Sequence, residues 1–306
     1  MIVASIDIGT NTVLLLIAKV DLKSQKISTL LNEYRMPRIG QGTRRSGVIS
    51  SEKIKSLYKV LDEYNQIIQN FNCEIVLLTG TNAFRMASNT NLIVKEIKNT
   101  YGYDLNVISG EKEAEYAYFG ATSELKDQYL TTVIDIGGSS TEIITGKAKK
   151  IITKNSLQVG SVSMTEQFLK NSPPMRLEVE YLISEVQKWF SSIQLDEKPR
   201  EVIAIAGTAT TLACMILGLK EFDEEKVNNY ITDIKDIKIL IEKLSKMKSE
   251  ELVEIFGSVL TGREDIIFAG IIILHQFMEL QKINHVKVST RGIRYGAIIS
   301  YLQKNN

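Results

Sequence analysis

The sequence predicts a mixed α/β protein made of two lobes, and three observations support this fold class. The chain has 306 residues, more than a single hydrophobic core usually organises. The tetrapeptide Ile-Asp-Ile-Gly occurs at residues 6–9 and again at residues 134–137, each time at the end of an apolar, β-branched stretch typical of a strand. After each copy, further strands are followed by alternating helices and strands. A duplicated βββαβα domain explains this repetition, and two such lobes predict a cleft between them.

The first lobe is expected to span residues 1–125 and to begin with a three-stranded meander. Apolar residues recur at the helical period from Ile54 to Ile68, and Ser51 is suited to cap this helix. The expected strands lie at 2–8, 13–21, 26–34, 74–81 and 105–108, and the further helices at 91–99 and 112–124.

The second lobe is expected to span residues 126–291 and to repeat this plan. Its expected strands lie at 131–138, 141–147, 151–157, 201–207 and 285–289. One helix is expected to begin near residue 162, and four further helices are expected at 176–191, 233–246, 250–256 and 262–282. A terminal helix within 292–306 is expected to pack back on the first lobe.

Composition and charge exclude several classes of partner. The net charge of +1 gives no global field for nucleic acid, so any anion must be recognised locally. The first residues form a strand with an Asp and no basic leader, and no apolar run is long enough for a membrane span. Cys73 and Cys214 lack metal or redox spacing, which fits a reducing compartment. We therefore expect a cytoplasmic protein with no nucleic-acid or membrane partner.

The first candidate site follows the first predicted strand, at residues 7–12. Asp7 ends the strand, Gly9 is a residue that can adopt positive φ, and Thr10 and Asn11 add a hydroxyl and an amide. Such a turn can face a phosphate with its N–H groups, while the Asp7 carboxylate orients a metal-bound water. An ordinary Asp-x-Gly turn explains the same residues.

The second copy of this turn is richer in polar groups. Its two carboxylates, Asp135 and Glu142, enclose the candidate phosphate-binding residues Gly137, Gly138, Ser139 and Ser140. Two strand-end loops could clamp one phosphate chain together with Mg²⁺, which prefers carboxylate and water oxygens.

A third glycine-rich segment, Ile-Ala-Gly-Thr-Ala-Thr-Thr at residues 205–211, follows a predicted strand and opens a helix. Backbone donors of Gly207 and Thr208 at the helix start favour an anion or a nucleotide sugar. Close packing of the strand against the helix explains Gly207 equally directly.

Seven motifs in a fixed order make the chain resemble the Ppx/GppA family of exopolyphosphatases and guanosine pentaphosphate phosphohydrolases. The motifs are IDIGTN, TNAFRMA, ISGEKEAEYAYFG, VIDIGGSSTE, AIAGTATTLA, REDIIFAGIIIL and VSTRGIRYG, and together they cover essentially the whole sequence. The resemblance implies two ribonuclease H-like domains of the actin-like ATPase superfold.

The resemblance also implies roles for individual residues. Glu113 matches the catalytic glutamate that positions or deprotonates water, and Arg85 the arginine on the phosphate to be removed. Asp135 and Glu142 match the metal and water ligands, with Glu142 also counted as catalytic, and Asp7 matches the first-loop carboxylate. The implied cofactor is Mg²⁺, with Mn²⁺ as an alternative and a requirement for a monovalent cation such as K⁺ left open. Family analogy implies a homodimer.

Three features depart from the family pattern or lie outside it. Ser139 replaces the third glycine of the second loop, and the motif Gly-Ile-Arg-Tyr-Gly at 292–296 lacks a glutamate that relatives carry. Arg44 and Arg45 lie in a glycine-rich segment. We expect them either to extend a basic track for a polyanion or to belong to a solvated loop.

The function expected from these features is Mg²⁺-dependent hydrolysis of a terminal phosphoanhydride. Both inorganic polyphosphate and the 5′ end of pppGpp fit such a site, and the sequence does not distinguish between these two substrates. It also leaves open whether (p)ppGpp is hydrolysed by the protein or regulates it. The alternatives are a kinase of the same superfold and a non-catalytic sensor that binds nucleotide or (p)ppGpp.

Overall fold

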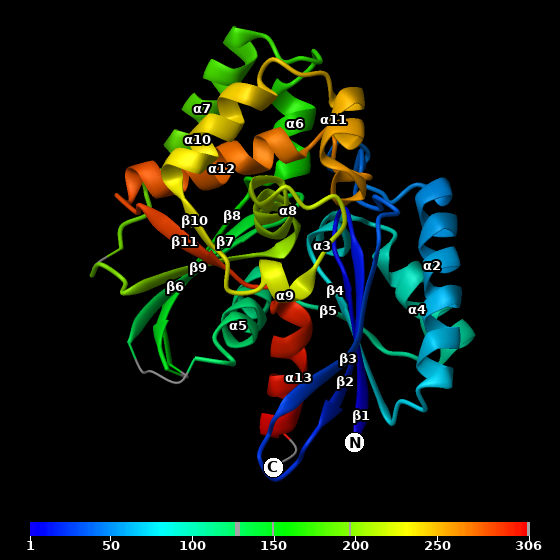
Figure 1. Ribbon diagram of the computed structural model, residues 1–306. Helices are drawn as coiled ribbons and strands as arrows, with labels where there is room; N and C mark the ends of the chain where they lie inside the picture. Colours follow the sequence, from blue (N-terminus) through cyan, green and yellow to red (C-terminus); the bar gives the residue numbers. More distant parts are fainter. Residues whose placement is uncertain (126–128, 149, 196, 305–306) are drawn as a thin grey trace. The chain divides into compact units, whose positions relative to one another are not determined.

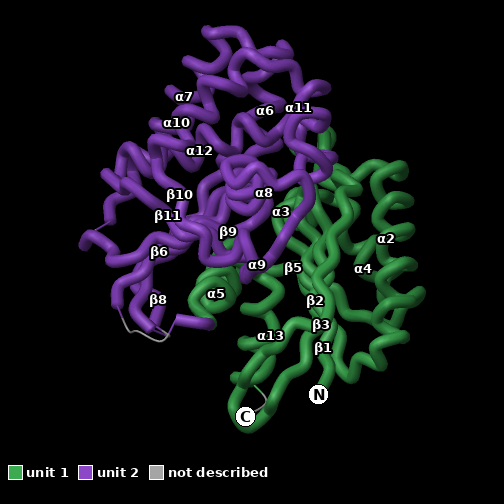
Figure 2. The backbone as a smooth tube through the Cα atoms, in the orientation of Figure 1, with its two compact units in different colours: residues 1–123, 293–306 green, residues 124–292 purple. Residues whose placement is uncertain are grey.

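The computed structural model describes residues 1–125, 129–148, 150–195 and 197–304 and contains two compact units (Figures 1 and 2). Unit 1 comprises Met1–Ser123 and Ile293–Asn306, and unit 2 comprises Glu124–Gly292. Residues 126–128, where the second lobe was expected to begin, and residues 305–306 of the expected terminal helix lie outside the described residues.

Unit 1 contains a five-stranded sheet with the strand order β3-β2-β1-β4-β5. Its strands are β1 (Ile2–Ile8), β2 (Val13–Val20), β3 (Ile27–Arg35), β4 (Ile75–Gly80) and β5 (Leu105–Val107). Its helices are α1 (Thr43–Ser46), α2 (Ser51–Asn70), α3 (Asn82–Met86), α4 (Thr90–Tyr101), α5 (Gly110–Ala121) and α13 (Ile293–Lys304). β1 pairs antiparallel with β2 and parallel with β4, and β4 pairs parallel with β5. The carboxyl ends of β1, β4 and β5 therefore meet at one edge of the sheet.

Helices cover both faces of this sheet, because side chains alternate between the faces along each strand. On β1, Ala4 and Ile6 belong to the core cluster that also holds residues of α2 and α4. Val3 belongs to a separate cluster with Tyr295 and Ile298 of α13. The C-terminal helix thus packs on the sheet of unit 1 and completes its core.

Local sequence rules missed details of this unit. Ser50, not Ser51, caps α2, because Ser50 is extended and its side chain accepts a hydrogen bond from the Lys53 amide at 3.4 Å. The expectation for Ser51 was wrong by one residue. The helices α1 and α3 were not expected, since four and five residues are too few for a helical period to be recognised.

Unit 2 contains a six-stranded sheet with the order β10-β11-β9-β6-β7-β8. Its strands are β6 (Leu130–Ile136), β7 (Thr141–Lys147), β8 (Lys150–Leu157), β9 (Glu201–Ile205), β10 (Ile231–Asp233) and β11 (His285–Val288). Its helices are α6 (Ser161–Phe168), α7 (Arg176–Phe190), α8 (Ala206–Leu217), α9 (Glu224–Val227), α10 (Ile234–Leu244), α11 (Ser249–Phe256), the 3₁₀ helix η1 (Ser258–Leu260) and α12 (Ile267–Leu280).

The two sheets share one plan, which confirms the predicted duplication. Strands β8, β7, β6, β9 and β11 follow each other as β3, β2, β1, β4 and β5 do, with parallel pairing of β6 with β9 as of β1 with β4. The strand β10 is an addition that pairs antiparallel with β11; neither it nor α9 was expected. Helix α12 begins at Ile267, five residues later than predicted, after a turn in which Gly262 has a φ of 75°.

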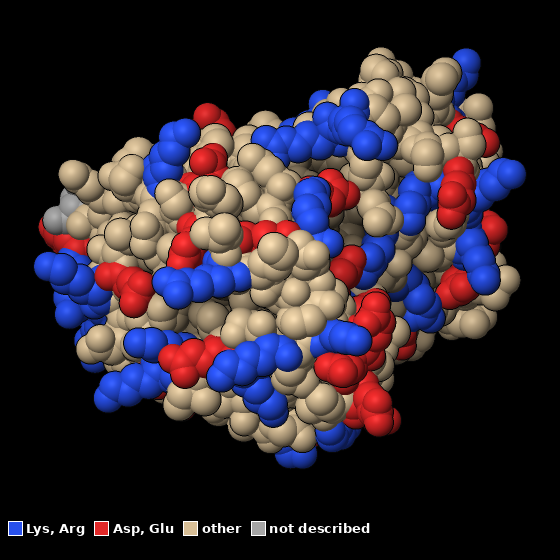
Figure 3. Space-filling view, turned by 90° about the horizontal axis from the view of Figure 1, so that it is seen from above, with Lys and Arg blue, Asp and Glu red and all other residues tan. Residues whose placement is uncertain are grey.

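On the face drawn in Figure 3, Lys and Arg side chains are interspersed with Asp and Glu. Within the described segments, no helix is long and apolar enough to cross a membrane.

The contact between α13 and α5 is a sensitive point of unit 1. A Cβ atom added to Gly296 would lie 1.9 Å from the Tyr116 carbonyl oxygen, and backbone cannot yield there as a side chain would. We expect Gly296→Ala to lower the free energy of unfolding by about 2–3 kcal/mol through overpacking, measured by urea denaturation. Without the close contact, the same change would stabilise the helix by up to about 1 kcal/mol. The exposed control Gln303→Ala should stay within about 0.5 kcal/mol of the wild type.

Candidate active site

The two loops that follow the central strands have the same internal hydrogen bond. In loop 1, which we define as residues 7–12, the Gly9 amide donates to the Thr12 carbonyl at 2.9 Å; in loop 2, residues 135–142, the Gly137 amide donates to the Ser140 carbonyl at 2.9 Å. Gly9 is not among the residues with positive φ, so this turn does not use the conformational freedom of glycine. A Cβ would lie 3.3 Å from the Thr12 oxygen at Gly9 and 3.2 Å from the Ser140 oxygen at Gly137. Both glycines are therefore explained by the close approach of the backbone within the turn.

A second glycine lies in close contact with each loop. In each unit this glycine belongs to the segment after the third strand, which is β3 in unit 1 and β8 in unit 2. A Cβ at Gly40 would lie 2.3 Å from Thr10 Cγ2, and a Cβ at Gly160 would lie 2.5 Å from the Gly138 backbone. The Gly40 amide also donates to the Thr10 carbonyl at 2.8 Å. Sequence reasoning assigned neither glycine to the site, although a glycine after the third strand of each half is a signal that could have indicated them.

In unit 1 the structure brings Arg85 and Glu113 into direct contact. Arg85 Nη1 lies 2.6 Å from Glu113 Oε2 and donates a second hydrogen bond to the Ile108 carbonyl at 2.9 Å. Arg85 is on α3, directly after β4, and Glu113 is in the first turn of α5, which Ser109 caps after β5. Only 8% of the Glu113 side chain is exposed. The parallel strands β4 and β5 thus place a partly buried ion pair at the sheet edge where loop 1 lies.

Burial and neighbouring charges set the protonation of the carboxyl groups in unit 1. Burial raises the pKa of Glu113, against the opposing effect of the Arg85 guanidinium. Burial raises the pKa of Asp7 to about 7, the Glu113 carboxylate adds to this increase, and Arg294 opposes it. The pKa of Asp7 therefore lies near neutral pH. A cation bound at this carboxyl group would favour its ionised form.

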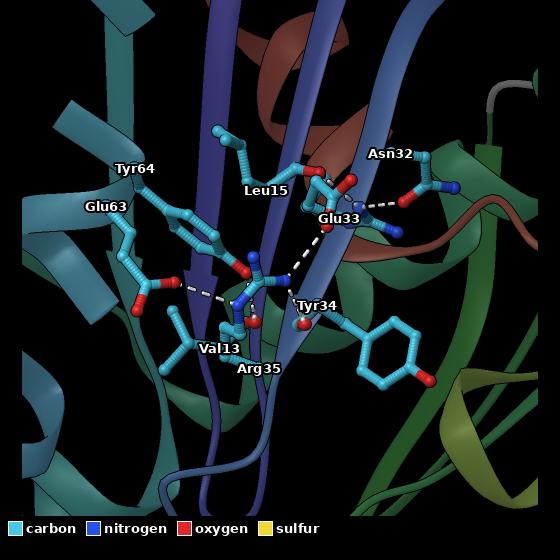
Figure 4. Close-up of polar contacts among 9 residues, drawn as sticks. Val13, Leu15, Asn32, Glu33, Tyr34, Arg35, Glu63 and Tyr64 are labelled. Atoms are coloured by element: carbon cyan, nitrogen blue, oxygen red, sulfur yellow. Dashed lines mark hydrogen bonds and ion pairs between the residues drawn. The ribbon is translucent and has the colours of Figure 1, made fainter. Parts of the chain in front are cut away.

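Buried side chains hold the strand that leaves loop 1. Tyr64 Oη donates to the Val13 carbonyl at 3.0 Å, and the ring of Tyr64 lies beneath the Arg35 guanidinium (Figure 4). Arg35 is bound in turn to Glu33 and Glu63. Arg294, from the Gly-Ile-Arg-Tyr-Gly motif, donates to the Leu15 carbonyl at 3.0 Å and to Asn32 Oδ1 at 2.5 Å. Sequence reasoning gave Arg294 no place in the site, because its partners Leu15 and Asn32 are 279 and 262 residues away.

In unit 2, two buried carboxylates stand opposite each other. Asp135 on β6 and Glu142 on β7 are direct partners across the antiparallel pair, so their side chains share one face of the sheet. Ser156 Oγ donates to Glu142 Oε1 at 2.7 Å. Like charges directly opposite each other are destabilising, and a divalent cation would remove that repulsion.

The carboxylates of both units fit Mg²⁺, as judged from their own environment. Asp7 Oδ1 is buried and makes no hydrogen bond within the described part of the chain, which suits a ligand atom. Mg²⁺ commonly binds one or two carboxylates and completes its shell with waters and substrate phosphates. Across the described segments, no cluster of three or more His, Cys, Asp or Glu side chains could hold a metal. Water and phosphate oxygens would therefore supply most of the shell.

The third loop is covered by a side chain that sequence reasoning did not place in the site. A Cβ on Gly207 would lie 2.0 Å from Arg263 Nη1, so the guanidinium lies directly on this glycine. Thr208 Oγ1 donates to the Ile136 carbonyl at 3.3 Å, which ties the start of α8 to the end of β6. Close packing explains Gly207, and Arg263 adds a positive charge beside the predicted anion site.

The predicted residues thus form one group in each unit. Loop 1, Arg85 and Glu113 gather at the carboxyl ends of β1, β4 and β5, while loop 2, Gly207 and Thr208 gather at the carboxyl ends of β6 and β9. Ser140 is buried, and Ser139 is half-buried. Arg44 and Arg45 are exposed on α1, so the basic track stays a prediction.

The strand order and the paired loops place the protein in the class of duplicated α/β folds, with one sheet plan in each unit. Residues 16–305 match the model of the Ppx/GppA phosphatase family, and the chain belongs to this family. Its fold agrees with the crystal structure of the Aquifex aeolicus family member, with a TM-score of 0.86 and 32% identity over 100% of this chain and 99% of that one.

Two curated relatives carry the names of phosphatases. Exopolyphosphatase 2 of Mycobacterium tuberculosis is 29% identical over 97% of this chain and 98% of its own length. A bifunctional 3-dehydroquinate synthase/phosphatase of Fusobacterium nucleatum is also 29% identical over 97% of this chain, but the chain spans 46% of that protein's length.

Asp7 should make the stability of the metal-free protein depend on pH. Its folded pKa of about 7 lies above the ordinary value of 3.8, so the folded state binds more protons, and stability falls as the pH rises between these two values. We expect Asp7→Asn to raise the free energy of unfolding at pH 8 by roughly 2–4 kcal/mol and to have little effect near pH 4, measured by urea denaturation with a chelator present.

Asp21 provides the control of opposite sign. Backbone amides of Ser24 and Lys23 lower the pKa of this exposed carboxyl. Asp21→Asn should therefore be less stable than the wild type at pH 8, and this difference should shrink at pH 3. Equal stability of wild type and Asp7→Asn at pH 8 would show that Asp7 is not buried as an ionised group.

The contact of Arg263 with Gly207 predicts that the effect of Gly207→Ala on the free energy of unfolding differs between the wild type and an Arg263→Ala variant. The guanidinium is the mobile end of a side chain, so Gly207→Ala should displace it at a cost of no more than about 1 kcal/mol. In an Arg263→Ala background the same change should be neutral or slightly stabilising, because alanine favours the helix. Urea denaturation of the four proteins measures this coupling, and strict additivity would contradict the contact.

Proposed function

We propose that this protein is a Mg²⁺-dependent phosphoanhydride hydrolase that releases the terminal orthophosphate of inorganic polyphosphate, the 5′ phosphate of pppGpp, or both. The observation that carries the proposal is the ion pair of the partly exposed Arg85 and the buried Glu113, 2.6 Å apart, beside a strand-end loop that carries Asp7. A guanidinium can neutralise phosphoryl oxygens and a carboxylate can accept a proton from water, and both groups assist phosphoryl transfer to water.

The ion pair couples substrate binding to the basicity of Glu113. In the structure Arg85 lowers the pKa of Glu113, while burial raises it. A phosphoryl group bound by Arg85 competes with Glu113 for the same guanidinium, which weakens the lowering effect. Glu113 then becomes a stronger base next to the bound phosphoryl group. It accepts a proton from the attacking water as the bond from phosphorus to the bridging oxygen breaks, and orthophosphate leaves.

The remaining predicted residues bind and neutralise the phosphate chain. The amides and hydroxyls of loop 1 and loop 2 are the donors, and Asp7, Asp135 and Glu142 are the carboxylates that would hold Mg²⁺. When bound, Mg²⁺ supplies charge neutralisation at the phosphate oxygens.

Family membership supports the reaction class, and the substrate remains part of the proposal. The name exopolyphosphatase 2 of the Mycobacterium tuberculosis relative favours polyphosphate. The family also includes guanosine pentaphosphate phosphohydrolases, so pppGpp stays in the proposal. We further propose Mn²⁺ as an alternative metal and a homodimer as the functional form.

The decisive test is phosphate release with Mg²⁺ from polyphosphates of several lengths, pppGpp and ATP, with wild type and Glu113→Gln side by side. We expect Glu113→Gln to lower kcat by roughly 10²–10⁴-fold, the usual contribution of a general base, with a smaller effect on KM. Glu111→Gln is the matched control, since Glu111 is an exposed residue in the same helical turn, and should retain activity.

Each alternative function predicts a different result in the same assay. A kinase would release no phosphate without an acceptor, and a sensor would bind pppGpp without turnover. Full activity of Glu113→Gln would remove this residue from the mechanism.

A further inference from the structure

Two buried side chains beside loop 1, Thr43 and Asn82, each have one polar group without a hydrogen-bond partner among the described residues. Thr43 is 3% exposed and Asn82 is 4% exposed. Thr43 Oγ1 and Asn82 Nδ2 make no hydrogen bond to any residue that the structure describes. Asn11 Nδ2, on loop 1 itself, is also buried and makes no hydrogen bond to a described residue. Leaving such groups unsatisfied in the interior is unfavourable, so three of them in one region need an explanation.

The backbone brings together the segments of unit 1 that carry these residues. Asn82 opens α3 directly after Thr81, whose amide donates to the Ile8 carbonyl at 3.2 Å, just before Gly9. Thr43 opens α1, three residues after Gly40, which is bonded to Thr10. Helix α1 packs against α3. Thr43 and Asn82 therefore come from two segments that pack on each other and on loop 1.

The neighbouring arginine fixes the orientation of the Asn82 amide. Arg85 Nη2 donates to Asn82 Oδ1 at 3.4 Å, and a guanidinium can only donate. The amide oxygen must therefore face Arg85, and the NH₂ group must face away from it. Nδ2 is an obligate donor that cannot bind a cation. Next to the positive charge of Arg85, such a donor suits an anion.

We propose that Thr43 and Asn82 are phosphate-binding residues that hold, with Arg85, the phosphoryl group to be removed. A terminal phosphoryl group has three non-bridging oxygens, whereas an internal one has two. Arg85 can contact two oxygens in a fork, and the Thr43 hydroxyl and Asn82 amide provide neutral donors for the third. The inference rests on the proposed function and adds to it, because such a pocket selects the end of a phosphate chain.

The isosteric change Thr43→Val tests this assignment with orthophosphate as the probe. It removes the hydroxyl and keeps the shape of the side chain. We expect the midpoint of urea denaturation without ligand to be unchanged or raised. Orthophosphate, added with Mg²⁺, should protect the wild type against thermal unfolding, and its apparent affinity should fall roughly 10-fold or more in the variant, as for a lost hydrogen bond to a charged group. Thr43→Ser keeps the hydroxyl and should restore most of the affinity.

Thr232→Val is the matched control. The Thr232 side chain is also buried, and its hydroxyl likewise makes no hydrogen bond within the described segments, but it lies on β10 in unit 2. The control should show the same tolerance to urea and wild-type protection by orthophosphate.

Asn82→Asp is the second variant. It keeps an oxygen for Arg85 but replaces the donor by a negatively charged acceptor, so protection by orthophosphate should be lost.

Each contrary result overturns the inference. A lower urea midpoint for Thr43→Val would show that the hydroxyl serves the fold, for instance through a buried water. Wild-type affinity for orthophosphate in Thr43→Val or Asn82→Asp would show that these groups do not face the phosphate, as would absence of any protection in the wild type. If the wild type hydrolyses polyphosphate and Thr43→Val keeps its KM, the pocket assignment fails while the proposed function stands. If neither substrate is hydrolysed but orthophosphate protection follows the pattern above, the proposed function fails and the pocket stands.

Discussion

Parallel pairing of the central strands is the constraint on which the rest of each unit depends. Because β1 runs parallel to β4, and β4 to β5, their carboxyl ends must lie at the same edge. Residues more than 100 positions apart, from Asp7 to Glu113, are thereby gathered without any direct link in the sequence. The same pairing of β6 with β9 gathers Asp135 and Thr208. Ligands of open α/β sheets bind at this edge for the same reason.

Gathering charged groups at a buried edge has an energetic cost, and the structure shows how unit 1 limits it. The Glu113 carboxylate is paired with Arg85, which offsets part of its desolvation. Among the described residues, Asp7 has no such ion pair, and burial raises its pKa to about 7. The ionised form of this buried carboxyl group therefore destabilises the fold.

The two units preserve the geometry of the loops while their chemistry has diverged. Each loop has the same glycine hydrogen bond and is pressed by a second glycine. The residue opposite Asp7 on the partner strand is Leu14, whereas the residue opposite Asp135 is Glu142. Only the second hairpin therefore opposes two carboxylates, while the first unit carries the pair of Arg85 and Glu113. The backbone plan is duplicated, and the charged side chains differ between the copies.

The sequence by itself determined the duplicated α/β plan, the strand-end loops and the family, because these depend on short-range patterns and on motifs in a fixed order. It located Glu113 in the first turn of a helix, since the helix expected at 112–124 directly follows an expected strand. It could not determine the cap at Ser50 or the short helices α1 and α3, where neighbouring residues offer nearly equal local choices. The contacts of Gly207 with Arg263, Gly296 with Tyr116 and Arg294 with Leu15 join distant segments. Only the tertiary structure decided these, because such contacts depend on how the strands and helices pack and leave no periodic trace in the sequence.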